Sequence, residues 1–544
     1  MKQHILALLG FAVILGTACN KSNNDNPTED PKIIVNTDAA ALAKRISLDG
    51  AGVLTLESTS SIARKAKGEF AKDGDQASQY LLELVAEVAP PTYNGVQMRA
   101  TSVDINGNYA YVSYNREGEV YLGGVSVFDI SNIQQPKLLS EALFPSTDIS
   151  AVKYFNGRLY VAGATSVDKD PSFTTPGIVG YVDIANNIPT GNFKFYSVPG
   201  QVATGLTILN GKIYAVSGAT GGLSVINAST FAAEKYVTSA DLRSVVGMTN
   251  KVAVLSGTNG VTTFSTVGDI IKNIALPTDV AEAQRNIDAK GDYVIVAAGK
   301  NGVQYYNSTS GAKTGQIDIP AVPTGVDPSD VVTNGVSYNN DGLFFSANGA
   351  AGVYVAKEGA NNSLELLGSL DLTGSSNYVK SAGNYIFVAN GRGGLKIIKM
   401  TKPTTNLCGN TYPSYTGSAW LNVNSGEKKY YSGAAALQGV NVNDVLYFCG
   451  SMTVESQLNI NSQGVFDIHG SLAFGKYNAG TTMNVNGTWN VEGSVVIYGD
   501  LTLNSGAKIN FLGSGASITI YGKVTKNSGV TITGTYTDTF NKLK

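Results

Sequence analysis

Residues 106–130 read NGNYAYVSYNREGEVYLGGVSVFDI, and this stretch decides the fold because relatives of it recur along the chain. It contains an Asn-Gly turn, a short strand with alternating apolar residues, a Gly-rich turn and a second strand that ends near Asp129. Six later segments repeat the pattern, and they begin at Asn156, Asn210, Thr249, Lys290, Asn340 and Ala382. Seven copies of one unit predict a repeat protein.

The spacing of the copies indicates a β-propeller. One glycine opens the second strand of every copy, at Gly124, Gly180, Gly222, Gly260, Gly302, Gly352 and Gly394. Units of about 40 to 50 residues with strand-length apolar runs are typical of propeller blades of four strands. Seven such units close a ring, which removes exposed sheet edges. We therefore predict an all-β fold with a seven-bladed propeller over residues 96–403.

Composition supports this fold and excludes several functions. The chain has 544 residues, of which 62 are Gly and only 15% are charged, and this favours short strands separated by turns. A formal net charge of −2 gives no indication of nucleic-acid binding. The two histidines are His4 and His469, which argues against a multi-His metal site. We predict no catalytic, cofactor-binding or metal-binding residue.

The first copy resembles a known family. Its second half, VSVFDISNIQQPKLLS at residues 125–140, resembles the LVIVD repeat, with an apolar strand, an Asp and a polar-Asn-Pro turn. YVDIANNIPTG at Tyr181 is a weaker match, and the other copies lack the signature. The resemblance implies a bacterial extracytoplasmic propeller, and it implies no particular activity because the family has no uniform one.

The N-terminus predicts export. Residues 1–19 combine Lys2 with an apolar run and then small residues, as a secretory signal does, and the run is too short to span a membrane. The final Cys19 resembles a lipoprotein lipobox, although Gly16 stands where Leu is expected. This resemblance implies that Cys19 is acylated and anchors the protein to the bacterial outer membrane, facing the periplasm or the cell surface. An ordinary signal peptide is the alternative. The polar residues 20–35 are typical of a flexible tether.

Residues 36–95 do not follow the repeat pattern. Ala, Lys, Glu and Leu occur there at helix-compatible spacing, and the Pro90-Pro91 pair would end any helix. The apolar residues Leu81, Leu82, Leu84, Val85 and Val88 would form one helix face. We predict a small helical or mixed lead-in that covers the propeller.

The C-terminal region has a different pattern. Residues 404–450 are irregular and contain Cys408 and Cys449, which we expect to form a disulfide that staples a cap, because exported proteins meet oxidising conditions. Two unpaired thiols are the alternative. In residues 451–544, apolar pairs at i and i+2 alternate with Asn, Gly and Ser, which is typical of a parallel β-helix or solenoid. Three faces per coil would give about four coils; an antiparallel sandwich is the alternative.

Several residues are weak candidates for function. VDKDP at Val167 and NNDG at Asn339 lack the ligand spacing of calcium loops, and GRGG at Gly391 lacks the Lys of a phosphate loop, so we interpret all three as turns. His469 is expected at a solenoid corner, and outward Asn and Thr residues are expected to hydrogen-bond from coil to coil. Five basic residues near turns are candidates for a central channel, although solvation is expected for each: Arg116, Lys153, Arg158, Arg243 and Arg285.

Together these features predict a non-enzymatic binding scaffold. Exposed loops on a rigid ring suit recognition of a protein or a glycan, and no nucleophile and base are evident in the sequence. The partners expected are the membrane, through the lipid, and a surface glycan or protein, but not nucleic acid. An enzyme that cleaves polysaccharide, either a hydrolase or a lyase, is the alternative, because carboxylates distant in sequence can meet in space. A third hypothesis is a structural spacer.

Overall fold

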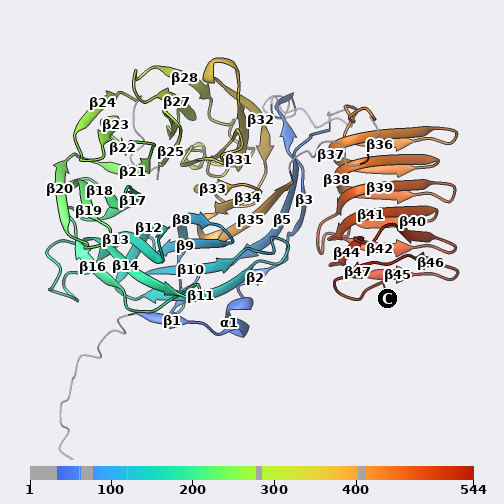
Figure 1. Ribbon diagram of the computed structural model, residues 1–544, viewed down its shortest axis with the longest axis horizontal. Coiled ribbons are helices and arrows are strands. Elements are labelled where there is room, and N and C mark those ends of the chain that lie inside the picture. The colour runs from blue at the N-terminus through green and yellow to red at the C-terminus, as the bar shows by residue number, and fades with distance from the viewer. Residues whose placement is uncertain are drawn as a thin grey trace, which may run out of the picture.

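The computed structural model describes residues 33–60, 62, 77–118, 120–276, 285–401, 408 and 412–543. Figure 1 shows a ring of sheets beside a stack of parallel strands, with the chain passing from the first body into the second. The ring is a seven-bladed β-propeller, and the stack is a β-solenoid of about 6 turns. The predicted all-β architecture is therefore confirmed.

Each blade is an antiparallel sheet whose first strand lies at the channel and whose fourth lies at the rim. Blade 1 contains β8 (Arg99–Asn106), β9 (Tyr109–Asn115), β10 (Gly123–Asp129) and β11 (Lys137–Phe144), and blade 2 contains β12 (Thr147–Phe155), β13 (Arg158–Thr165), β14 (Gly177–Ala185) and β16 (Lys194–Ser197), with β15 (Ile188–Pro189) paired to β14. Blade 3 contains β17 (Ala203–Leu209), β18 (Lys212–Ser217), β19 (Gly222–Asn227) and β20 (Ala233–Thr238). Blade 4 contains β21 (Leu242–Gly247), β22 (Lys251–Ser256), β23 (Gly260–Ser265) and β24 (Ile270–Ile274).

Blades 5 to 7 follow the same plan. Their strands are β25 (Ile287–Lys290), β26 (Tyr293–Ala297), β27 (Val303–Asn307) and β28 (Lys313–Ile317); β29 (Gly335–Tyr338), β30 (Leu343–Ala347), β31 (Val353–Glu358) and β32 (Leu364–Leu370); and β33 (Tyr378–Ala382), β34 (Tyr385–Ala389), β35 (Leu395–Thr401) and β5 (Leu81–Val88). The 3₁₀ turns are η1 (Pro328–Asp330), η2 (Ala360–Asn362) and η3 (Gly391–Gly393). Apolar residues between neighbouring blades form the core.

The lead-in closes the ring, and this corrects part of the sequence prediction. Residues 36–95 are mixed, but the apolar stretch assigned to a helix face is strand β5, which pairs with β35 as the rim strand of blade 7. Both faces of β5 are buried, so its apolar residues run almost continuously, and such a run does not distinguish strand from helix. The lead-in thus supplies a structural part of the propeller.

Other lead-in elements extend the rims. Strand β1 (Ile34–Asn36) adds to β11, β4 (Glu57–Ser58) adds to β32, and both β2 (Ile46–Ser47) and β3 (Gly52–Leu54) add to β5. Helix α1 (Ala39–Ala43) is capped by the Asp38 side chain, and β6 (Thr92–Tyr93) and β7 (Val96–Gln97) form a short hairpin. Three blades therefore carry a fifth strand from the N-terminal segment.

The solenoid is parallel throughout its described strands, so the antiparallel alternative is wrong. Its strands are β36 (Trp420–Val423), β37 (Lys428–Val442), β38 (Val445–Ile460), β39 (Val465–Phe474), β40 (Thr482–Val485), β41 (Thr488–Ile497), β42 (Asp500–Leu503), β43 (Lys508–Phe511), β44 (Ser517–Ile520), β45 (Val524–Lys526), β46 (Thr531–Thr533) and β47 (Thr537–Asp538). It begins inside the predicted cap, since β36 and β37 belong to the same sheet as the later coils. It therefore has about 6 turns instead of about four.

Inward and outward residues of the solenoid have separate roles. Inward residues such as Phe448 and Trp489 fill one continuous apolar core. Outward amides hydrogen-bond along the axis, as predicted: Asn441 donates to Asn422 at 3.0 Å, and Asn459 donates to Asn441 at 2.9 Å. These ladders satisfy polar groups between coils and fix the parallel register.

The two bodies are docked through buried contacts. The Tyr498 hydroxyl oxygen of the solenoid lies 3.0 Å from Glu83 Oε2 of β5 and 2.9 Å from Gln134 Oε1 of the propeller. Lys399 of β35 lies 2.9 Å from the other oxygen of Glu83. The main-chain N–H of Val53 donates to the carbonyl oxygen of Gly475 at 2.9 Å. Burial, and then the Glu83 charge, raises the pKa of Tyr498 well above its ordinary value.

Candidate functional site in the propeller channel

One residue from each innermost strand occupies an equivalent position around the channel. The strand registers align these residues, which we call the channel belt: Asp104, Lys153, Thr207, Val246, Asp288, Ser337 and Lys380. Because alternate residues of a strand point to opposite faces, equivalent registers place these side chains at one level of the ring. The charged members are two aspartates and two lysines.

Asp104 joins blade 1 to blade 2. One carboxylate oxygen lies 2.5 Å from Lys153 Nζ, and the other accepts a hydrogen bond from the main-chain N–H of Tyr154 at 2.9 Å. The Asp104 residue is only 3% exposed. The carboxylate therefore satisfies an N–H group on the free edge of the neighbouring inner strand, which has no strand partner there.

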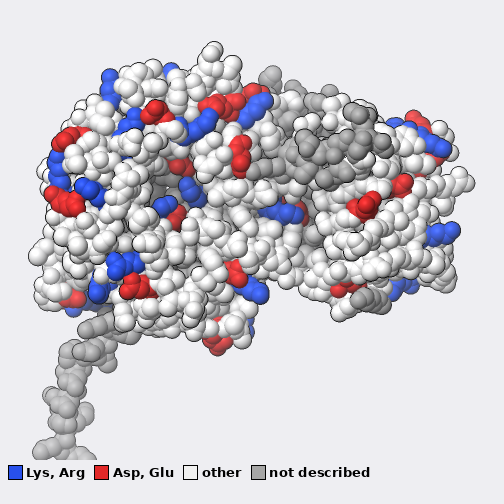
Figure 2. All heavy atoms as spheres, viewed as in Figure 1, with Lys and Arg blue, Asp and Glu red and all other residues white. Residues whose placement is uncertain are grey.

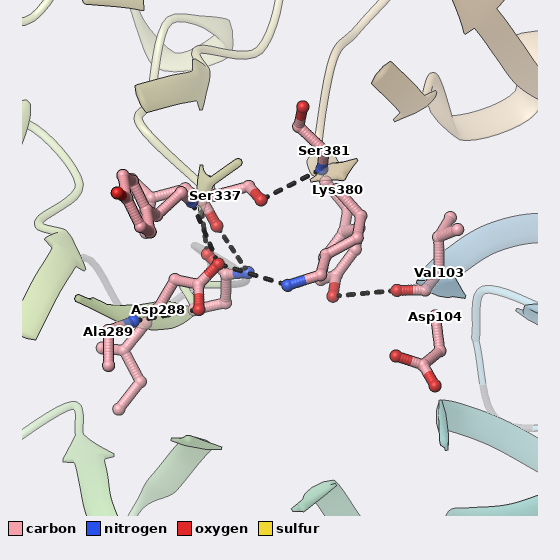
Figure 3. A network of polar contacts seen from close by, with 12 residues as sticks. Val103, Asp104, Asp288, Ala289, Ser337, Lys380 and Ser381 are labelled. Carbon is pink, nitrogen blue, oxygen red and sulfur yellow. Dashed lines mark hydrogen bonds and ion pairs between the residues drawn. The ribbon is translucent and has the colours of Figure 1, made fainter. Parts of the chain in front are cut away.

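Asp288 joins blade 5 to blade 6 through an equivalent main-chain contact, and it also contacts blade 7. It accepts a hydrogen bond from the Tyr338 main-chain N–H at 3.0 Å, and its Oδ2 lies 3.2 Å from Nζ of Lys380 in blade 7. Figure 3 shows Lys380 pointing toward Asp288, near Ser337. Ser337 accepts from the Ser381 main-chain N–H at 3.0 Å. A small residue in blade 6 thus leaves room for the lysine to reach blade 5.

The fixed charges perturb the groups beside them. Burial alone would lower the pKa of Lys380, but the carboxylates of Asp288 and Asp104 outweigh it and raise that pKa, so Lys380 stays protonated. Burial, followed by the Asp288 charge, raises the pKa of Tyr378, whose hydroxyl lies 3.5 Å from the Val103 carbonyl oxygen. The channel therefore holds preorganised charges at neutral pH.

The belt lies in a polar cavity of about 320 Å³. Figure 2 shows blue and red side chains around a hollow over the ring. At the end where the inner strands begin, the cavity is also lined by Arg99, Arg243 and Arg285. Arg243 Nε lies 2.7 Å from Asp241, and Arg285, 2% exposed, donates to the Gly257 carbonyl oxygen at 3.3 Å. The lining therefore contains more basic side chains than acidic ones, since its acidic members are Asp104 and Asp288.

The five basic candidates separate into two groups. Lys153, Arg243 and Arg285 line the channel cavity, so solvation on the outer surface was the wrong expectation for them. Arg158 instead lies 2.8 Å from Asp183 at the rim of blade 2. Arg116 is outside the residues that line the channel cavity.

The turn-like motifs behave as turns. Asp170 of the VDKDP segment accepts from the Ser172 N–H at 3.1 Å, and Asn339 of NNDG accepts from the Leu343 N–H at 3.1 Å. GRGG forms the turn η3, in which Gly391 has φ +57° and Gly394 φ +80°. Within the described ranges, no group of three or more His, Cys, Asp or Glu residues is placed to hold a metal ion.

The cysteine predictions have different outcomes. Cys408 and Cys449 form a disulfide with Cα atoms 6.0 Å apart, so the unpaired alternative is wrong. Cys19 lies outside the described residues. None of the described helices is long and apolar enough to cross a membrane.

Sequence reasoning missed Asp104, Asp288 and Lys380. Their signal was present, because each lies two residues before the end of an inner strand that precedes a copy's turn. Aligning the copies on those turns, instead of on the later glycines, would have placed the three in one column with Lys153. Their long-range pairing was not predictable, since it depends on Ser337 being small.

Both carboxylates of the described channel belt are already engaged by lysines and main-chain N–H groups. A general acid or base needs a carboxyl group that can exchange a proton with a substrate. Groups held in this way instead offer fixed charges and hydrogen-bonding positions, which suit binding.

Comparisons with known proteins agree with this architecture. The LVIVD repeat family model matches residues 99–142 and 373–405, which contain blade 1 and the inner strands of blade 7. The first segment includes the predicted resemblance at 125–140; the second lies in blade 7, whereas Tyr181 is outside both. No curated protein sequence matches the chain significantly.

Solved structures resemble the chain only distantly. The computationally designed Ika8 protein has 12% identity and a TM-score of 0.39, over 65% of this chain and 98% of its own. The WD40 propeller domain of Doa1 has 12% identity and a TM-score of 0.41, over 57% and 96%. Virginiamycin B lyase from Staphylococcus aureus has 14% identity and a TM-score of 0.42, over 59% and 99%. These values carry no inference about function. The chain is thus a seven-bladed β-propeller with a C-terminal β-solenoid, and the LVIVD repeat model matches two segments of the propeller.

Proposed function

We propose that this protein is an exported, non-enzymatic binding scaffold that recognises a protein or a glycan. The observation that carries the proposal is the state of the channel carboxylates. Asp104 and Asp288 each hold a lysine and a main-chain N–H of another blade, so they rigidify the ring. A propeller with LVIVD repeats suggests a binding scaffold, and a rigid wall keeps the entropy cost of binding low.

The docking of the two bodies supports the same function. Glu83 is 2% exposed and contacts Tyr498 of the solenoid and Lys399 of the propeller. A partner that touches both bodies would meet surfaces already in fixed relative positions. The conformational freedom that the protein loses on binding is therefore small, which favours recognition.

Export and anchoring are part of the proposal. The leader ending at Cys19 supports secretion and lipid attachment, and the Cys408–Cys449 disulfide suits an oxidising compartment. Acyl chains contribute about 0.8 kcal/mol per buried methylene, so several chains hold a protein firmly on a membrane. We propose an outer-membrane lipoprotein that faces the periplasm or the cell surface.

A second candidate function is cleavage of polysaccharide. It is favoured by one pair on the solenoid, where His469 Nδ1 lies 2.5 Å from Glu492 Oε2. A histidine beside a carboxylate can take and return a proton. This reaction would need a substrate bound across the outer solenoid face.

One experiment separates the two functions. Chain 20–544 is screened against immobilised glycans and cell-envelope proteins, and release of reducing ends is monitored in the same wells. Binding without sugar release is the expected result. Release of reducing ends that is lost in His469→Ala would overturn the binding proposal in favour of the enzyme, and no binding at all would also overturn it.

A further inference from the structure

The outer face of the solenoid carries a cluster of aromatic and polar side chains that is separate from the propeller channel. Three columns of outward residues run along the axis, one residue per coil, because the parallel strands are in register. The middle column contains Tyr430, Tyr447, Asp467 and Asn490 in successive coils. Neighbouring coils lie about 4.8 Å apart, so a ligand along the axis meets a new side chain at each coil.

The N-terminal part of this face is aromatic. The rings of Tyr430 and Tyr447 have centroids 6.0 Å apart, and the ring of His469 lies 4.7 Å from that of Tyr447. Tyr430 is 40% exposed, so part of its ring can be reached by a ligand. The ring of Tyr412 also stacks on Tyr430 at 5.5 Å and meets Tyr447 edge-on at 5.2 Å, so the rings form one cluster. The C–H face of a sugar ring can pack on the exposed part of this cluster.

The adjoining part of the face is polar and prearranged. Asp467 accepts a hydrogen bond from Asn490, and Asn510 donates to Asn490 at 2.8 Å. His469 Nδ1 lies 2.5 Å from Glu492, whose side chain is 54% exposed. Amides and imidazole can donate to and accept from hydroxyl groups, carboxylates accept from them, and the mutual contacts of these groups fix their orientation.

A hollow of about 520 Å³ lies among these groups, lined by Tyr447, His469, Gly470, Glu492 and Cys408. The described residues that line it include a carboxylate but no lysine or arginine. An acidic ligand in this hollow would meet the Glu492 carboxylate, and like charges repel. The charge of the hollow therefore favours a neutral ligand over an acidic one.

From this geometry we propose that Tyr430, Tyr447, Asp467, His469 and Glu492 form a binding site for a neutral glycan chain that lies along the solenoid axis. The proposal rests on the binding function and names its ligand class and location. The aromatic rings pack against the sugar rings, while the polar groups hydrogen-bond to hydroxyls on neighbouring units.

The test uses chain 20–544 and two probes, a neutral β-linked glucose hexasaccharide and a hexagalacturonate, with affinities from isothermal titration calorimetry. We expect the neutral probe to bind and the acidic probe to bind at least about tenfold more weakly. Tyr430→Ala and Tyr447→Ala should each lower affinity about tenfold, equivalent to about 1.4 kcal/mol. Tyr236→Ala is the matched control, since Tyr236 is also 40% exposed but lies on blade 3.

Thermal melting of each variant verifies folding, and Glu492→Gln tests the polar part without removing packing. A stronger response to hexagalacturonate, or unchanged affinity in both tyrosine variants, would overturn the glycan site. Failure of the neutral probe to bind would overturn it as well. If the chain then still captured another glycan or a protein in the screen above, the binding function would stand without this site.

Discussion

Lys380 of blade 7 lies 3.2 Å from Asp288 of blade 5, so one ion pair spans two blade boundaries inside the channel. The side chains of Lys380 and Asp288 are 25% and 14% exposed. Removing one partner leaves the other charge poorly solvated. The pair therefore gives a direct measure of how strongly the channel belt ties the ring together.

We expect Asp288→Ala to lower the free energy of unfolding by about 2 to 4 kcal/mol, because it leaves the Lys380 charge and the Tyr338 main-chain N–H without their partner. The double variant Asp288→Ala/Lys380→Met should recover part of this loss. Chemical denaturation of the four proteins of the cycle gives the coupling energy. The control is Asp183→Ala, whose partner Arg158 is near the surface, with an expected loss below about 1 kcal/mol. Equal losses for both aspartates would contradict the prediction.

Asp148 should make stability depend on pH. Burial, partly offset by hydrogen bonds from the Leu122 and Arg116 main-chain N–H groups, raises its pKa from 3.8 to about 6. Between these values the folded state binds the proton more tightly than the unfolded state does, so stability falls as pH rises from about 4 to 6. Asp148→Asn keeps an oxygen acceptor for Leu122 and should remove this slope. Denaturation midpoints at several pH values test it; an unchanged slope in the variant would count against it.

Strand β5 should be essential for ring closure. A chain that starts at Ala77 keeps this strand, whereas one that starts at Pro90 lacks it and exposes the edge of β35. Unpaired sheet edges promote association. Size-exclusion chromatography should show the shorter chain as aggregates and the longer one as a monomer. A monomeric chain from Pro90 with the same melting temperature as the longer chain would show that β5 is dispensable.

The disulfide should stabilise the start of the solenoid. It closes a loop with a sequence separation of 41, and a loop of this length contributes roughly 3 to 5 kcal/mol in the chain-entropy model. The variant Cys408→Ala/Cys449→Ala should unfold at lower denaturant concentration. Adding a reductant to the native protein should produce the same shift, while the variant should not respond. A reductant effect of equal size on the variant would assign the shift to another cause.

Lipid attachment at Cys19 has a separate test. In cells that express the full chain, Cys19→Ala should move the protein from the membrane fraction to the soluble fraction, because no acyl chain is then present. Globomycin, which blocks lipoprotein signal cleavage, should cause an unprocessed form to accumulate only when Cys19 is present. Unchanged membrane partitioning of the variant would refute the anchor.

The sequence determined the propeller because the pattern at residues 106–130 is local and recurs. Hairpin turns and alternating apolar residues act within one blade, so each copy reports its own structure. Leu81 to Val88 were misassigned for the opposite reason, since their strand partners lie about 300 residues away in β35. The start of the solenoid at Trp420 was missed similarly, because its register depends on β37.

Whether a candidate site could be predicted depends in the same way on whether its residues form a local pattern. The Cys408–Cys449 pair was predictable because its chemistry leaves few partners. The Lys380–Asp288 pair and the column from Tyr430 to Asn490 arise only when strands align side chains from different repeats or coils. No local pattern marks such residues, and their spacing follows from loop lengths that vary between copies.

Glu83 gives the fold an order of assembly. It lies on β5, which a chain made from its N-terminus contains early, while its partners Lys399 and Tyr498 come more than 300 residues later. Strand β5 can pair early with β2 and β3, but its other edge has no partner until β35 of blade 7 has been made, and the solenoid packs against the completed joint after that. The solenoid, which is made last, contacts β5 at the point where β5 and β35 close the propeller. Moving β5 away from the ring would therefore also break the contact between Glu83 and Tyr498 of the solenoid.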